Sequence, residues 1–298
     1  MERTKQNIPD LILCSDIHLR EDTPVCRTDN YWERQWIKMD FIADLQKQYG
    51  CPVVCGGDLF HHWKASPYLL SETMLHIPKK FYSIAGQHDL ANHSLSLFYK
   101  SSIHTLERAG KLVFLPRVHF GMSPEDFQDE TSAGVEDWLG IEDKKILVWH
   151  KLAYQTEPFP GATGGNALQL LKKYPQFDLI LCGDNHVTFV EEYQGRLLVN
   201  PGSMMRMTAI QADHKPCVFL WYAESNSVVQ VFLPIEEGVV SREHLAAKEQ
   251  RNDRIDAFVN KLTGDYKTEL SFEENLNLFF QTNDVEEDVK QIIYKAIE

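Results

Sequence analysis

The sequence of 298 residues lacks the features that would mark a membrane, fibrous or secreted protein. No apolar run approaches the roughly 20 residues that a membrane-spanning helix needs, and no internal repeat or low-complexity segment is visible. Residues 1–6 are polar and lead directly into a short apolar stretch, which is unlike a secretory signal. Hydrophobic residues make up 43% and charged residues 24%, as in an ordinary globular protein. We therefore expect a cytoplasmic protein that makes no membrane contact.

Positive charge is also scarce. The chain has 30 lysines and arginines against 43 aspartates and glutamates, which gives a formal net charge of −13. A protein that coats nucleic acid through surface electrostatics is normally basic, because its affinity comes from neutralising phosphates. The composition argues against such a module, but it does not exclude an enzyme whose bound metal ions supply local positive charge.

The six cysteines are scattered and show no Cys-x-x-Cys spacing. Cys51 and Cys55 are the nearest pair, and they bracket a strand-like segment. Four residues of strand separate the Cα atoms by roughly 13 Å, which is beyond the reach of a disulfide. We expect reduced cysteines, as is usual in the cytoplasm.

Short, continuous apolar runs alternate with helix-like stretches through the first two thirds of the chain. Because they show little polar alternation, these runs are typical of strands that are buried on both faces. The runs lie at residues 11–14, 52–55, 81–84, 111–114, 146–149, 179–182 and 196–199. Helices are expected at 31–49 and 166–173, and a β-hairpin at 217–222 and 228–233. This alternation predicts the α/β class.

Beyond Pro234 the sequence changes character, because no strand-like run follows and apolar residues fall on helical stripes. The stripes consist of Leu245, Ile255, Phe258, Val259 and Leu262, and of Val285, Val289, Ile292, Ile293 and Ala296. Ser271 and Glu274 have the spacing of a capping box, in which each side chain accepts from a free amide at a helix start. We expect a main domain at 1–236 and a short helical appendage at 237–298.

Polar residues follow five of the expected strands directly. They are Asp16 and His18, Asp58 and His61, the run Gln87-His88-Asp89, His150, and Asp184 with His186. In open α/β sheets, ligands bind outside the carboxyl ends of the strands, so these loops should meet at one pocket. Carboxylate, amide and imidazole groups together suit manganese, iron or zinc. Two ions that share a carboxylate can activate a water molecule and polarise a phosphoryl group.

Each of these short motifs is weak by itself. An Asp-x-His occurs by chance, a single histidine after a strand is more often structural, and Gly-Gly-Asp is more often a turn than a ligand. Five such motifs in this order, each at a strand end, favour the functional interpretation strongly.

The series resembles the calcineurin-like metallophosphoesterase superfamily, whose pattern is D-x-H, G-D, G-N-H-D/E, H and G-H-x-H. The matching segments are Asp16-Ile17-His18, Gly57-Asp58, Gly86-Gln87-His88-Asp89, His150 and Gly183-Asp184-Asn185-His186, with Asn200-Pro201-Gly202-Ser203 also typical. Ser15 to Leu19 and Gly56 to His61 are most similar to the SbcD group of DNA repair nucleases, and the compact length is compatible with a phage or prophage gene. The resemblance implies two packed β-sheets flanked by helices.

It also implies roles for individual residues. Asp16, His18 and His186 resemble ligands of a first metal ion, and Asp58 resembles the bridging ligand. Gln87, His150 and Asp184 correspond to ligands of a second ion. His88 matches the histidine that stabilises or protonates the leaving group, His61 matches a second catalytic histidine of the nuclease branch, and Asp89 is placed to orient the His88 ring. Both ions are expected to be divalent, with manganese first and magnesium, iron or zinc as alternatives.

Two positions depart from the family pattern. Gln87 stands where asparagine is usual, so the amide oxygen is kept but reaches one methylene further. Asp184 stands where histidine is usual. Two divalent ions (+4) with Asp16 and Asp58 (−2) leave +2, and Asp184 lowers this to +1. The identity and affinity of the second ion therefore become a question.

Several neighbouring residues have a plainer interpretation. Arg forks match phosphate oxygens and aromatic rings stack on bases, but salt bridges and packing are the commoner roles. This applies to Arg20, Arg206, Trp32, Trp36, Trp63, His62 and His93.

Three functions stay open. The first is an SbcD-like, metal-dependent DNA exo- or endonuclease in which two ions activate the attacking hydroxide. The second is a phosphoesterase acting on a small phosphate ester, cyclic nucleotide or phosphoprotein. The third is a non-enzymatic subunit with a degenerate second metal site. His61 favours the first. An SbcC-like ATPase partner or a homodimer through the tail is left open.

Overall fold

The computed structural model describes residues 8–115, 141, 144–158, 164–243, 245 and 272–297. The chain divides into two compact units, Met1–Ser241 and Arg242–Glu298, and each is described by itself. Among the described helices, none is long and apolar enough to cross a membrane.

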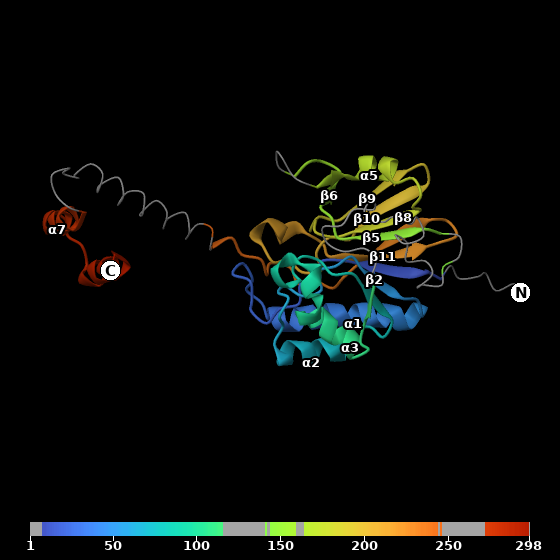
Figure 1. The fold of residues 1–298 in the computed structure, drawn as a ribbon, viewed down its shortest axis with the longest axis horizontal. Coiled ribbons are helices and arrows are strands. Elements are labelled where there is room, and N and C mark those ends of the chain that lie inside the picture. Colours follow the sequence, from blue (N-terminus) through green and yellow to red (C-terminus); the bar gives the residue numbers. More distant parts are fainter. Residues whose placement is uncertain are drawn as a thin grey trace, which may run out of the picture. The chain divides into compact units, whose positions relative to one another are not determined.

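The first unit is built on two β-sheets (Figure 1). The first sheet has the order β12-β11-β1-β2-β3-β4, and the second has the order β5-β8-β10-β9. The bounds in the first sheet are β1 Leu11–Cys14, β2 Val53–Cys55, β3 Phe81–Ser83, β4 Val113–Phe114, β11 Cys217–Tyr222 and β12 Ser227–Phe232. Those in the second are β5 Ile146–Trp149, β8 Leu179–Cys182, β9 Phe189–Tyr193 and β10 Arg196–Asn200. Strands β1 to β4 are mutually parallel, as are β5, β8 and β10.

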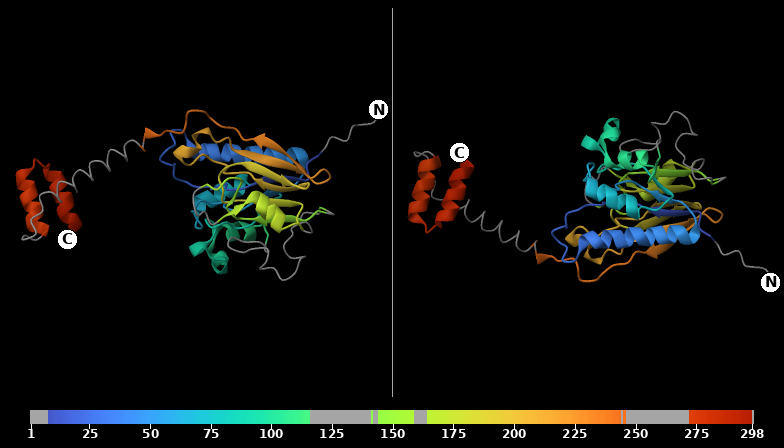
Figure 2. Two further views of the ribbon diagram at one scale, coloured as in Figure 1. Left: turned by 90° about the horizontal axis from the view of Figure 1, so that it is seen from above. Right: turned by 90° about the horizontal axis from the view of Figure 1, so that it is seen from below.

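Helices cover the outer face of each sheet, so the unit has four layers. The first sheet carries α1 (Tyr31–Tyr49), α2 (Pro67–His76) and α3 (Ser102–Arg108), and the second carries α5 (Ala167–Lys173). The views in Figure 2 show α1 lying across the first sheet on the side away from α5. Short elements complete the unit, namely β6 Ala153–Tyr154, β7 Gly165–Asn166, and 3₁₀ helices at Ala91–His93, Leu95–Lys100 and Ala209–Asp213.

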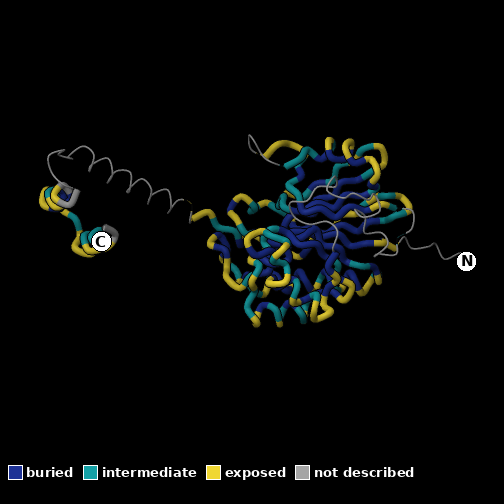
Figure 3. Tube along the Cα trace, in the orientation of Figure 1, coloured by how far each residue is buried: buried dark blue, intermediate teal, exposed yellow. Residues whose placement is uncertain are grey.

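Alternate residues of a strand enter different cores. Leu11 and Leu13 of β1 lie in the core between the two sheets, whereas Ile12 and Cys14 pack in the core beneath α1. Both faces of the central strands are therefore buried, as the dark strands of Figure 3 show. This explains why the strand sequences are continuous apolar runs. The α/β class with two packed sheets flanked by helices is confirmed.

Helix α1 has the predicted bounds because both of its ends are specified locally. Asn30 accepts a hydrogen bond from the Glu33 amide at the N-terminus. Gly50 adopts a left-handed conformation (φ 73°) at the C-terminus and donates to the Gln46 carbonyl. The expected strand at 111–114 is shorter in the structure, since β4 contains only Val113 and Phe114.

The division between the units falls after Ser241, a few residues beyond the boundary expected at 236/237. The cause is a return of the chain onto the first unit, where Thr28 donates to the Val239 carbonyl and Ser241 donates to the Cys26 carbonyl. Residues up to Ser241 therefore belong with the sheets.

The second unit contains helices α7 (Phe272–Thr282) and α8 (Glu287–Ile297). Leu276, Phe279 and Phe280 of α7 are buried against Val285, Ile293 and Tyr294. The helix expected here is confirmed, and of its apolar stripe Val285 and Ile293 pack in this cluster while Val289 and Ile292 are exposed. Ser271 of the predicted capping box and the stripe at 255–262 lie outside the described residues.

Candidate metal centre

The loops that follow β1, β2, β5 and β8 bring their polar side chains to one place. Ligand atoms of Asp16, His18 and His186 lie within 4.8 Å of one another, and so do those of Asp16, Asp58 and His150. Asp16 belongs to both groups. The structure thus gathers residues that are far apart in the sequence, in the two sets that two neighbouring ions would need.

The first group is held close by its histidines. His18 Nε2 lies 3.1 Å from His186 Nε2 and 3.9 Å from Asp16 Oδ1. His186 Nε2 lies 3.8 Å from the same carboxylate oxygen. Three donor atoms therefore face a common point, and His186 is the member open to solvent.

Asp58 lies between the two groups. Its Oδ2 is 3.7 Å from His18 Nε2 and 3.4 Å from His150 Nε2. A carboxylate near both histidines can be shared by two cations, and so can Asp16, which belongs to both groups. His150 Nδ1 is 2.7 Å from the Gly56 carbonyl, which can only accept, so this nitrogen carries the hydrogen. The Nε2 lone pair of the neutral ring is then directed at the centre.

Gln87 and Asp184 are hydrogen-bonded to each other, and Asp184 is hydrogen-bonded to Asp16, which belongs to both groups. Gln87 Nε2 donates to Asp184 Oδ1 at 2.6 Å, and the Asp184 amide donates to Asp16 Oδ1 at 3.0 Å. The bond fixes the Gln87 amide so that its nitrogen faces Asp184. Gln87 Oε1 is buried and, among the described residues, has no hydrogen-bond partner.

Other oxygens at the centre share this property. Asp16 Oδ2 and Asp58 Oδ2 are buried and make no hydrogen bond of normal geometry within the described part of the chain, and the group that faces Asp58 Oδ2 is the His150 ring at 3.4 Å. Buried oxygens without a donor are rare in folded proteins because they have lost their hydration. Together with the imidazole groups of His18, His150 and His186, they form a donor set that fits divalent cations.

The electrostatics of the centre point the same way. Burial, reinforced by Asp58, raises the pKa of Asp16 to about 7. Burial also opposes ionisation of Asp58, yet the facing His150 and His18 hold the pKa of Asp58 well below its usual range. Burial disfavours the charged His150 ring, but Asp58 overcomes this and raises the pKa of His150 to about 10. Protons therefore occupy positions that a cation would take, and cation binding would release them.

The backbone of the loops is strained at these residues. Asp16, His18, Asp58 and Asp184 all have positive φ angles, of 50°, 52°, 54° and 76°. This left-handed region is uncommon for residues other than glycine, and it costs on the order of 1–3 kcal/mol at each position. Such strain clusters at functional sites, where it directs side chains that a relaxed loop would turn elsewhere.

Glycine is required where the loops touch. A Cβ atom on Gly86 would lie 2.1 Å from Asp58 Oδ1, and one on Gly183 would lie 2.4 Å from Ser15 Oγ and 2.6 Å from His150 Nδ1. Any side chain at these positions would displace the candidate ligands.

His61 and His88 lie side by side next to the centre. Their rings stack with centroids 5.4 Å apart, and the His88 ring meets the His18 ring edge-on at 4.9 Å. His88 Nδ1 is 2.9 Å from the His61 carbonyl, so Nδ1 carries the hydrogen and Nε2 is left for chemistry. Burial, with Arg20 nearby, lowers the pKa of His61 to about 4.

The expectation that Asp89 orients the His88 ring is wrong. Asp89 is buried, and its carboxylate accepts from the amides of Leu59 (3.1 Å), Phe60 (2.9 Å) and Gly86 (3.1 Å). The His61 carbonyl holds the His88 ring instead. Asp89 is thus a positioning residue that ties together the loops after β2 and β3, and burial and the charge of Asp58 raise its pKa to about 7.

Two asparagines to which the sequence analysis gave no role position the loop after β8. Asn185 Nδ2 donates to the Ala153 carbonyl, while its Oδ1 accepts from the Val187 amide. Asn200 Nδ2 donates to the carbonyls of Asn185 and Val187. Hydrogen bonds from both asparagines therefore hold the loop that carries His186 in place. The Asn-Pro-Gly-Ser run was the available signal for Asn200.

Several neighbouring residues make local contacts within the protein. Arg20 pairs with Asp22, and Arg206 donates to the carbonyls of Ala212 and Glu236. The aromatic and imidazole side chains pack locally: Trp32 on Tyr68 and Trp36, Trp63 on His62, and His62 against the Lys64 amide.

Comparison with known proteins identifies the family. The profile of the calcineurin-like phosphoesterase superfamily domain matches residues 10–223. The chain therefore belongs to the calcineurin-like phosphoesterase superfamily, whose members are metal-dependent and act as hydrolases. A comparison with curated protein sequences gave no match.

Solved structures show a distant likeness. An archaeal phosphodiesterase is 13% identical, with a TM-score of 0.43 over 75% of this chain and 99% of its own. The phosphopantetheinyl hydrolase of Mycobacterium tuberculosis is 12% identical, with a TM-score of 0.44 over 76% and 96%. A putative 5'-nucleotidase from Staphylococcus aureus is 14% identical, with a TM-score of 0.42 over 82% and 58%. Likeness at this level says nothing about the substrate.

Proposed function

We propose that the protein is a metal-dependent phosphodiesterase that cleaves DNA, as a nuclease similar to the SbcD group. The observation that carries this proposal is the stacked pair His61 and His88 beside the candidate metal centre. These rings face His18 closely and form a third possible ligand group with it, but the family motifs place them outside the two expected ligand sets. His61 is the residue that the nuclease pattern adds to the general phosphoesterase motifs.

The two histidines suit the proton transfer that cleavage of a diester needs. When bound, divalent ions would supply a nucleophile at neutral pH and polarise the phosphoryl oxygens. His88 holds its Nδ1 hydrogen on the His61 carbonyl, so its Nε2 is the atom that can give a proton to the leaving oxygen.

The charge of the centre favours a diester. Asp184 adds a carboxylate where the family pattern has a neutral imidazole, and it lies against Gln87. The extra negative charge should repel a doubly charged monoester more than a singly charged diester.

A cavity beside His186 favours an organic substituent on the phosphate. It has a volume of about 400 Å³ and is lined by Asn185, His186, Val187, Thr208, Ile210, Gln211 and His214. Ile210 is 91% exposed and Val187 is 65% exposed, although both are apolar. Pockets of about 300–1,000 Å³ with apolar walls hold ligands the size of a nucleoside.

The test measures hydrolysis with manganese and after chelation. The purified protein is assayed on labelled single- and double-stranded DNA, on bis(p-nitrophenyl) phosphate and on p-nitrophenyl phosphate. We expect DNA and the diester to be cleaved, activity to vanish with chelator and return with manganese, and Asp58→Asn to be inactive. Asp178→Asn, at a partly exposed carboxylate that accepts from one amide, is the control that should stay active.

Other results would change the assignment. Cleavage of the monoester in preference to the diester would favour a phosphoesterase of small substrates. Bound manganese with no hydrolysis of any ester would favour the non-enzymatic subunit. Full activity of the chelated protein would contradict the metal dependence itself.

A further inference from the structure

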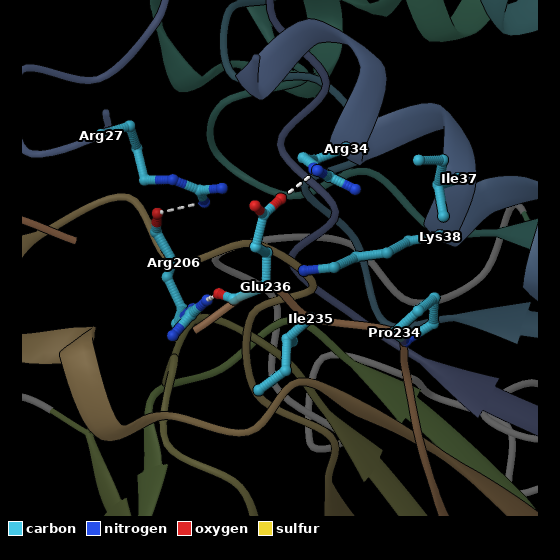
Figure 4. A pocket seen from close by; sticks show the side chains of 8 residues that line it. All are labelled: Arg27, Arg34, Ile37, Lys38, Arg206, Pro234, Ile235 and Glu236. Atoms are coloured by element: carbon cyan, nitrogen blue, oxygen red, sulfur yellow. Dashed lines mark hydrogen bonds and ion pairs between the residues drawn. The ribbon is translucent and has the colours of Figure 1, made fainter. Parts of the chain in front are cut away.

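A second pocket of the first unit is lined by basic side chains. Arg34 and Lys38 reach it from α1, Arg27 from the loop before α1, and Arg206 from the loop after β10 (Figure 4). The segment Pro234 to Glu236, after β12, forms the remaining wall. The cavity has a volume of about 40 Å³, which is room for a few water molecules. Its size suits a small oxyanion and not a nucleobase.

The acids around this pocket do not balance its bases. Arg27 is paired with Asp29 at 2.5 Å, and Arg34 is paired with Glu236 and lies 3.7 Å from Asp29. Four basic groups and two carboxylates leave a local charge of +2 when Lys38 is protonated. In a chain of net charge −13, a positive pocket is not a by-product of composition.

Lys38 is the least compensated of the four. Its side chain is 3% exposed, and Nζ donates to the Met204 carbonyl at 2.8 Å. This bond uses one of the three hydrogens of the ammonium group. Among the described residues, no carboxylate lies within ion-pair distance of Nζ. A buried ammonium group without an anion is costly.

Arg206 is the second such cation. It is 5% exposed, and its terminal nitrogens donate to the Ala212 and Glu236 carbonyls. Its Nε is buried and has no hydrogen-bond partner within the described part of the chain. Burial, with Arg27 and Arg206 nearby, lowers the pKa of Lys38 to about 7, which is what a missing counter-charge would cause.

We propose that this pocket binds a tetrahedral oxyanion, with Lys38 Nζ and Arg206 Nε as its main donors. The chemistry recognised is that of phosphate, whether as the free ion or as the terminal phosphate of an oligonucleotide. Glu236 lies at the pocket with its side chain 49% exposed, and its carboxylate competes with the ligand. Because the Met204 amide also donates to the Asp16 carbonyl, the pocket lies two hydrogen bonds from the candidate metal centre.

The test titrates inorganic phosphate into the metal-free protein, so that ions at the candidate centre cannot bind it. Calorimetry should show one site, and thermal unfolding should shift upward with phosphate concentration. Lys38→Met, which keeps the length of the side chain but removes the charge, should weaken binding at least tenfold. Glu236→Gln should tighten binding several-fold, because a competing anion is lost. Lys79→Met, an exposed lysine outside the pocket, should bind as the wild type does.

A second measurement separates a ligand site from a closed salt-bridge network. Without phosphate, Lys38→Met should unfold at the wild-type temperature or above it, because a buried cation is replaced by an apolar chain. A 5'-phosphorylated oligonucleotide is titrated in parallel with its unphosphorylated form. Binding that needs both Lys38 and the terminal phosphate, with no binding of the free ion, would assign the site to nucleic acid. If neither ligand binds in a manner that depends on Lys38 and Glu236, the proposal is overturned.

Discussion

Asp89→Asn tests whether Asp89 builds the centre or takes part in the reaction. The carboxylate is buried and accepts from three backbone amides, two from the loop that carries Asp58 and one from the loop that carries Gln87. The substitution keeps the size and shape of the side chain. It replaces one accepting oxygen with an NH₂ group, which must face at least one of the three amides.

The cost follows from these contacts. A hydrogen bond to a charged acceptor contributes about 1.5–3 kcal/mol, against about 0.5–1.5 kcal/mol for a neutral one, and a buried amide left without an acceptor costs about 1–3 kcal/mol. One amide is left unsatisfied and two bonds are weakened, but removal of a buried carboxylate with a raised pKa offsets part of this cost, so we expect a loss of about 1–3 kcal/mol of unfolding free energy. The loops should also separate, so manganese affinity should fall by about tenfold or more.

Urea denaturation in chelator measures the stability, and calorimetric titration measures manganese binding. Asp178→Asn is the control, because Asp178 accepts from one amide, that of Lys145, and pairs with Lys144 at a partly exposed position. It should lose about 1 kcal/mol or less. If Asp89→Asn kept the wild-type stability and manganese affinity but lost its hydrolysis rate, Asp89 would act in the reaction and the positioning role would be wrong.

Three further predictions concern other parts of the molecule. His88→Ala should keep wild-type manganese binding but lose about 10²–10⁴-fold in hydrolysis rate, as for a positioned acid; metal loss in elemental analysis would make His88 a ligand instead. The pKa of Lys38 is lowered to about 7 in the folded protein, so between pH 7 and 10.5 the unfolded chain binds more protons than the folded one. The free energy of unfolding should therefore rise with pH, by at most ~1.4 kcal/mol per pH unit. Urea denaturation between pH 7 and 9 should show a smaller rise for Lys38→Met than for the wild type. Deletion of residues 242–298 should leave manganese binding intact but impair DNA cleavage or self-association. If the truncated protein cleaves DNA at the wild-type rate and has the same oligomeric state in solution, these residues have neither role.

The central strands and α1 could be predicted because each carries a local signal. Central strands are buried on both faces and so appear as continuous apolar runs, and α1 has a cap at each end. Strand β9 was not predicted because it lies at a sheet edge, where only Phe189 of its five residues is buried. Helix α2 was missed for a similar reason, since it buries only Leu69 and Thr73. Elements that bury little have little apolar periodicity to read.

The site could be predicted in its residue types but not in its internal connections. Parallel strand order brings Asp16 and Asp58 to one edge of the first sheet, and the packing of the second sheet brings His150 beside them. The role of Asp89 does not follow from the sequence. Its neighbour in the sequence is His88, but the three amides that donate to its carboxylate are brought close only by the fold. The left-handed backbone of Asp16 and Asp58 is equally invisible, since neither residue is a glycine.

The last prediction concerns Asp184, whose charge and ligand type can be separated by two variants. Asp184→Asn removes the negative charge and still offers an oxygen, whereas Asp184→His removes the charge and offers an imidazole nitrogen. A unit charge acting over about 5–6 Å at an effective dielectric of about 20 contributes roughly 3 kcal/mol. Because Asp184 is only half-buried, solvent reduces this, and we expect about a tenfold change.

Both variants should therefore lower the ratio of diester to monoester hydrolysis by about tenfold at saturating manganese. Only Asp184→His should also shift metal preference toward zinc, since imidazole suits zinc better than an oxygen ligand does. The ratio is measured with bis(p-nitrophenyl) phosphate and p-nitrophenyl phosphate, and the preference by competition between the two metals. Both variants remove the negative charge of residue 184. An unchanged ratio in both would therefore mean that this charge does not affect which ester is cleaved, and that Asp184 has no part in substrate choice.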